Sequence, residues 1–109
     1  MAYDEDLADQ VRQLLARRKG ISEKRMFGGI AFLKDGNMCC GVVNEDVVLR
    51  LGPEGGVAAL DEPDIRPMDF TGRPMKTMVY LGAPGWEDRN VLKSWVERAL
   101  AFCSTLPPK

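Results

Sequence analysis

The sequence predicts an α+β fold in which a mostly antiparallel five-stranded sheet carries helices packed on one face. Strand-like segments follow one another through short turns such as Asp35–Gly36, without the crossover helices that a parallel sheet needs. Helical patterns lie at both ends of the chain, and one short helical segment separates the third strand from the fourth. The expected order of elements is therefore α-β-β-β-α-β-β-α.

The chain is expected to open with an amphipathic helix over residues 4–19. Its apolar positions recur at a helical period and are Leu7, Val11, Leu14 and Leu15. Acidic residues precede this stripe, and Gly20 beyond it is a typical helix stop. We interpret the basic trio Arg17, Arg18 and Lys19 as charges that complement the helix dipole, with a nucleic-acid contact as the alternative.

Three strands are expected next, over residues 25–33, 38–44 and 47–51. Gly28 and Gly29 lie inside the first, although glycine weakens a strand unless the backbone bends or is approached closely. A phosphate-binding loop would need a helix after the glycines, and an apolar strand follows instead. We therefore interpret them as a bulge or a close packing contact under a helix, which lets the sheet curve.

The second half of the chain alternates between short strands and helices. The expected elements are a helix over 53–60, strands over 65–70 and 75–81, and a helix over 87–106. Pro67 predicts that its strand lies at a sheet edge or contains a bulge, because proline cannot donate a ladder hydrogen bond. Trp95 falls in the apolar stripe of the last helix, so we expect it to anchor the core.

Composition limits the classes of function. The 109 residues fit one domain, 1–109, and the net charge of -1 gives no overall attraction to nucleic acid or to an anionic membrane. The chain contains no histidine, which removes imidazole as a base or a metal ligand. The acidic N-terminus has no signal-peptide pattern, and no apolar run is long enough to span a bilayer. We expect a cytoplasmic protein that is not an enzyme, with no catalytic residue, no cofactor and no metal site.

The three cysteines, Cys39, Cys40 and Cys103, are an odd number and do not form the pattern of a disulfide framework. Neighbouring residues on a strand point to opposite faces, so Cys39 and Cys40 are not expected to hold one ion together. A structural zinc site also needs about four Cys or His ligands. We expect reduced structural thiols, with one of the adjacent pair buried and the other partly exposed.

Basic residues on the predicted strands form the candidate contact set, which is Arg25, Arg50, Arg66, Arg73 and Lys76. The last four lie on the third to fifth strands and their connecting turn, and Arg25 opens the first strand. If their side chains share the open face of the sheet, they form a small basic patch suited to phosphate or to an acidic protein. The alternative is an ordinary solvated face whose charges are balanced by nearby carboxylates.

Several motifs occur together in one order along the chain. They are Arg25-Met26-Phe27-Gly28-Gly29, the Asp35-Gly36 turn, Leu49-Arg50-Leu51, Met68-Asp69-Phe70, Met75 to Tyr80, and the ending Trp95 to Leu100. As a set they resemble the N-terminal domain of the TfoX/Sxy family of bacterial competence regulators over nearly the full chain, and the ending resembles that of the stand-alone members. The resemblance implies an α+β domain similar to the secretion-chaperone-like architecture. Full-length members regulate natural transformation genes as co-activators beside the cAMP receptor protein, and they carry a helical C-terminal domain that this chain is expected to lack.

Three functions stay open at this point. The first is a non-catalytic interaction module, a transcription-regulatory accessory protein that binds a protein partner or its own copy as a homodimer. The second is direct nucleic-acid binding through the candidate contact set. The third is a small-ligand binder or an enzyme of unknown reaction that uses the Gly28–Gly29 region with Cys40. The resemblance and the lack of histidine favour the first.

Overall fold

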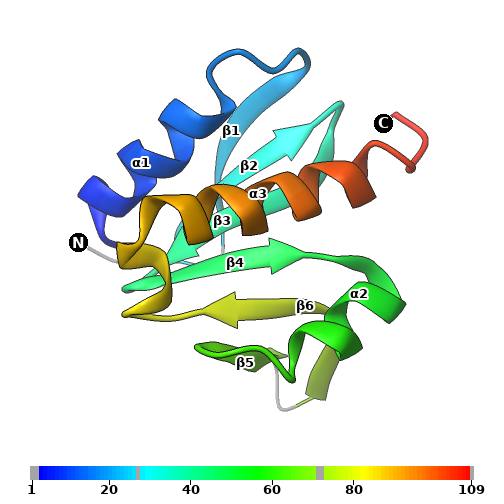
Figure 1. The fold of residues 1–109 in the computed structure, drawn as a ribbon. Coiled ribbons are helices and arrows are strands. Elements are labelled where there is room, and N and C mark those ends of the chain that lie inside the picture. The colour runs from blue at the N-terminus through cyan, green and yellow to red at the C-terminus, as the bar shows by residue number, and fades with distance from the viewer. Residues whose placement is uncertain (1–2, 27, 71–72, 109) are drawn as a thin grey trace.

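The structure, a computed structural model, describes residues 3–26, 28–70 and 73–108. Its strands form one sheet in the order β1-β2-β3-β4-β6-β5, with antiparallel pairing between all neighbours (Figure 1). The strands are β1 (Ile21–Met26), β2 (Gly29–Lys34), β3 (Asn37–Val43), β4 (Asp46–Arg50), β5 (Ile65–Phe70) and β6 (Arg73–Leu81). The helices are α1 (Glu5–Leu15), α2 (Gly52–Ala59) and α3 (Arg89–Cys103), with a 3-10 turn at Gly85–Glu87. The α+β class and the antiparallel sheet are confirmed, and the sheet of six strands has one more than expected.

The additional strand arises at the two glycines that we expected inside a single strand. β1 and β2 form a hairpin in which Met26 pairs with Gly29. Gly28, between them, has a φ of 72°, a left-handed conformation that residues with a side chain rarely adopt. The prediction of one bent strand over 25–33 was therefore wrong, because the chain reverses direction here.

Gly29 is needed for a different reason, which is the close approach of a neighbouring strand. A Cβ atom added at Gly29 would overlap the carbonyl oxygen of Val42 on β3. The expected close contact is therefore present, but it is made with strand backbone rather than with a helix. The pairing of β2 with β3 consequently depends on the absence of a side chain at this position.

The long helices α1 and α3 lie side by side across one face of the sheet, and α2 packs against β6 at one end (Figure 1). Both long helices begin at an aspartate that accepts hydrogen bonds from helix amides. Asp4 accepts one from Leu7 N at 3.1 Å, and Asp88 accepts one from Asn90 N at 2.9 Å. The expected layer of helices on one face is confirmed. None of the helices in the described ranges has the length and apolar character that crossing a membrane requires.

The main core lies between the helical layer and the sheet. Phe32 on β2 and Leu49 on β4 are fully buried beneath Leu92 on α3 and the apolar stripe of α1. Trp95 on α3 joins the same cluster with only 6% of its surface exposed, so the predicted core anchor is confirmed. The core therefore fixes α3, the helix that borders both of the grooves described below.

Candidate functional site

The structure does not bring the described members of the predicted basic set together. Arg25 is exposed on β1 at one edge of the sheet, and Arg66 is exposed on β5 at the opposite edge, with four strands between them. The side chains of Arg73 and Lys76 lie outside the described residues. A shared patch thus has no support from the part of the sheet that is described, and the role of these residues as contacts stays a prediction.

Two of these arginines already have partners within the protein. Arg66 forms an ion pair with Asp46 at 2.6 Å, and its guanidinium lies 5.3 Å from the centre of the Tyr80 ring. Arg50 donates a hydrogen bond to the carbonyl of Met38 at 3.3 Å and lies 5.9 Å from the ring of Phe102 on α3. These contacts hold both guanidinium groups against the fold, which lowers their capacity to bind a partner.

The cysteines form one buried cluster between β3 and α3, which differs from the expected arrangement. Cys39 and Cys40 are both fully buried in the main core, and Cys103 on α3 is only 2% exposed. The register shifts here, because Cys40 pairs with Phe32 whereas Met38 pairs with the next residue of β2, and Cys39 is the extra residue of a bulge. The expectation of opposite faces was wrong because strict alternation fails at a bulge. Among the described residues, no group of three or more Cys, His, Asp or Glu side chains is arranged to hold a metal ion.

The thiols are expected to be unreactive in the native protein. The Cys103 thiol is hydrogen-bonded to Cys39 and buried, and both effects raise its pKa far above the usual range. The hydrogen bond with Cys103 lowers the pKa of Cys39, but the hydrogen bond with Cys40 and burial together outweigh it, so this pKa is also raised. The thiolate is the reactive form, so alkylation at pH 8 should be slow in the native state and complete for all three cysteines in denaturant.

The raised pKa values of Cys39 and Cys103 determine how the stability of the protein changes with pH. An unfolded thiol ionises near the reference pKa of 9.0, whereas the native thiols of Cys39 and Cys103 stay protonated there. Their contribution to the free energy of unfolding is therefore complete below about pH 9 and is lost as the pH rises further.

Mass spectrometry of iodoacetamide-treated protein measures the alkylation of each cysteine. Rapid labelling of Cys39 or Cys103 in the native protein would contradict the expectation that these thiols are unreactive.

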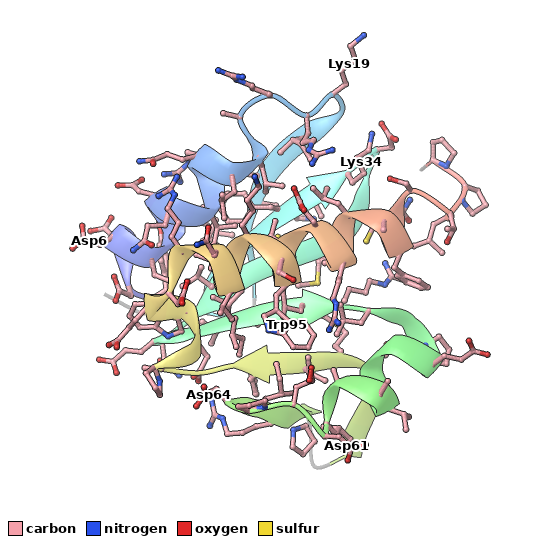
Figure 2. The ribbon with its side chains drawn as sticks, viewed as in Figure 1. Asp6, Lys19, Lys34, Asp61, Asp64 and Trp95 are labelled. Atoms are coloured by element: carbon pink, nitrogen blue, oxygen red, sulfur yellow. The ribbon has the colours of Figure 1, made fainter. Side chains whose placement is uncertain are left out.

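An apolar groove between α2 and α3 is the strongest candidate for a binding site; it is called the α2–α3 groove below. It consists of two adjoining hollows of about 550 and 560 Å³ that share Glu62, Trp95 and Arg98. The buried face of Trp95 forms part of its floor, together with Leu51 and Ala59. Figure 2 shows Trp95 between the α3 ribbon and the sheet, on the side toward Asp61 and Asp64. Residues of the main core thus form the floor of the groove between the two helices.

Exposed apolar side chains lie on the elements that border this groove, and one of them lines it. The large hydrophobic residues that are exposed in the described part of the chain are Val57 (57%), Leu60 (43%) and Val91 (37%). Val57 and Leu60 belong to α2 and its end, and Val91 lies in the first turn of α3 and lines the groove. Scattered exposed apolar residues are ordinary on proteins, but the position of Val91 in the lining of an apolar hollow is typical of an interaction surface.

Charge is distributed unevenly around the α2–α3 groove. Glu62, Asp64 and Asp88 contribute three carboxylates to the lining of one hollow. The guanidinium of Arg98 lies 4.4 Å from the centre of the Trp95 ring and covers the floor between the hollows. The Asp88 carboxylate is engaged by amides of α3, which leaves Glu62 and Asp64 as the exposed anionic groups at this end. The groove is therefore apolar with an acidic rim.

Sequence reasoning missed this groove, although a signal for it was present. Val91 is an apolar residue that falls outside the buried stripe of its helix. Such a residue indicates an apolar surface that the fold does not cover. The groove itself could not be predicted, because it depends on how α2 and α3 sit on the sheet.

Comparison with known proteins assigns the family. The model of the TfoX N-terminal domain matches residues 13–103, which include β1 to β6 and all but the first turns of the helical layer. No curated protein matches the chain significantly. Because the matched region covers most of the 109 residues, this chain belongs to the TfoX N-terminal domain family.

Proposed function

We propose that this protein is a non-catalytic interaction module that binds a protein partner in the α2–α3 groove. The observation that supports this most strongly is the exposed Val91, which lines the groove together with Trp95 of the main core. Buried apolar anchors at the centre of an interface supply most of the binding free energy in protein complexes. Cys40, which an enzymatic role would use, has no exposed surface.

The partner's chemistry follows from the groove and its rim. The apolar floor suits one or two aliphatic or aromatic side chains, as in the binding of an amphipathic helix to a groove. The exposed carboxylates of Glu62 and Asp64 suit lysine or arginine residues beside those apolar anchors. We therefore assign the groove to an amphipathic segment with a basic flank, and self-association as a homodimer is the competing outcome.

The family resemblance supports a cellular role for such a module. It is consistent with a transcription-regulatory accessory protein that contacts a component of the transcription apparatus, as competence regulators of the TfoX/Sxy type do. We place the protein in the cytoplasm, because its three cysteines are free thiols of the kind that a reducing compartment maintains.

A pair of charged substitutions tests the groove. The double variant Ala58→Glu, Val91→Glu places negative charge in the apolar surface and should reduce the amount of bound partner at least tenfold, which corresponds to about 1.4 kcal/mol. Ala58 is exposed on α2 and lines the groove, and a glutamate at the third position of α3 suits the positive end of the helix dipole, so the fold should persist. The measurement is a pull-down, in which each immobilised variant captures protein from nuclease-treated lysate of the cells that express it.

Lys24→Glu on the exposed surface of β1 is the control, since it also adds negative charge but lies away from the groove. It should retain the partner at the wild-type level. Equal retention by the groove variant and the wild type would contradict the proposal. Sedimentation of the purified protein distinguishes a different protein partner from a second copy of the chain. A concentration-dependent dimer that the groove variant abolishes would assign the groove to a second copy instead.

A further inference from the structure

A second groove, between the C-terminal end of α1 and the first half of α3, has the opposite chemistry; it is called the α1–α3 groove below. It is an open hollow of about 680 Å³. Its charged lining consists of Arg17, Arg18, Arg89, Lys93 and Glu97. Four cations and one carboxylate give this lining a net charge of +3, so the rest of a chain with a net charge of -1 carries -4. The fold therefore concentrates positive charge at one place on a chain that is slightly acidic.

The cations of this groove are only weakly engaged within the protein. Arg18 reaches Glu97 at 3.5 Å, and Arg89 donates to the side chain of Gln13 at 3.4 Å, both at the long limit for such contacts. In the described part of the chain, Arg17 and Lys93 form no ion pair. All four side chains are exposed, so they can bind an anion without first breaking a strong internal interaction.

We propose that the α1–α3 groove binds the phosphodiester backbone of a nucleic acid. A nucleic-acid strand carries one negative charge per nucleotide, which matches a groove with a net charge of +3, whereas a peptide reaches that density only with consecutive acidic residues. Three of the four cations are arginines, whose planar guanidinium forks bind phosphate oxygens in pairs. The site differs from the basic set that the strands suggested, because its residues come from α3 and from the segment after α1.

Neighbouring charges indicate the end at which a bound strand leaves the groove. Figure 2 shows Asp6 at one end of the α1 segment and Lys19 beyond the other. Lys19 extends the positive surface past Arg17 and Arg18, whereas Asp6 at the start of α1 repels phosphate. The strand is therefore expected to leave the groove toward Lys19, and its bases need no specific contact with the protein.

Fluorescence anisotropy with a fluorescein-labelled 20-nucleotide single strand and a 20-base-pair duplex tests this proposal. The variant Arg17→Ala, Lys93→Ala should bind at least tenfold more weakly at low salt. Its plot of log affinity against log salt should be less steep by about 1.4 for the single strand, since each phosphate contact contributes about 0.7 to the slope. The variant Glu97→Gln removes the carboxylate of the groove and should bind about threefold more tightly, a gain that misfolding cannot produce.

The matched control is Lys24→Glu, which lowers the charge of the exposed surface of β1 by the same two units. Its affinity should stay within twofold of the wild type. No binding of either probe by the wild type, or an equal loss in the control, would overturn the proposal. Tighter binding of a labelled twelve-residue polyglutamate peptide than of either nucleic acid would assign the groove to an acidic protein segment and would also overturn it.

Discussion

Replacing Trp95 with alanine is expected to lower the free energy of unfolding by about 3–5 kcal/mol. Trp95 is 6% exposed and packs in the main core, where it also forms the floor shared by both hollows of the α2–α3 groove. Its truncation removes a large apolar surface and leaves a cavity that the rigid sheet below cannot close. Because small domains are stable by about 5–15 kcal/mol, the variant should unfold at a much lower urea concentration.

Arg98→Ala is the matched control for this experiment. It removes the cation that lies 4.4 Å from the Trp95 ring but leaves the indole in place, and an exposed contact of this kind contributes about 0.5–1 kcal/mol. Urea unfolding followed by circular dichroism measures both variants. A loss from Trp95→Ala no larger than that from Arg98→Ala would mean that Trp95 does not anchor the core.

Replacing Gly29 with alanine is expected to cost about 3 kcal/mol, near the upper end of the usual penalty for overpacking. The added methyl group would overlap the carbonyl oxygen of Val42, a backbone atom in the β2–β3 ladder that cannot rotate away as a side chain would. Either the ladder opens or β2 shifts along β3, and both disturb the centre of the sheet. The free energy of unfolding from urea titration is again the measurement.

The adjacent Gly28 separates steric overlap from backbone strain. A Cβ atom there meets nothing within 4 Å, so Gly28→Ala should cost only the penalty of its left-handed backbone, about 1 kcal/mol. Gly28→Asn should cost less, because asparagine tolerates this conformation. Equal losses at Gly28 and Gly29 would show that the close approach of β3 is not what requires glycine.

The sequence predicted elements well where a single local rule decides the outcome. Pro67 predicted an edge strand or a bulge, and β5 lies at the sheet edge with a register shift at Pro67–Met68. The apolar stripe of the last helix predicted the burial of Trp95. In both cases the chemistry of one residue or one helical period was sufficient, without knowledge of the neighbouring elements.

The errors arose where local rules compete. Two glycines in an apolar run fit a bend and a hairpin equally well, and the positive φ of Gly28 decides for the hairpin. The bulge at Cys39 depends on how β2 aligns with β3, which no local pattern reveals. Both grooves join residues far apart in the chain, such as Arg17 with Lys93, so they depend on how the helices pack on the sheet. Candidate sites of this kind are properties of packing rather than of spacing.

Site-specific photo-cross-linking tests the central claim, that the α2–α3 groove binds a protein partner, most directly. A photoreactive phenylalanine analogue replaces Ala58 or Val91 in the groove, or Lys24 on β1, and the cross-linked peptides are identified by mass spectrometry. The account predicts a partner peptide with apolar residues beside lysine or arginine, cross-linked at positions 58 and 91 and not at position 24. Equal cross-linking at position 24, or none at the groove positions while the partner is bound, would contradict it.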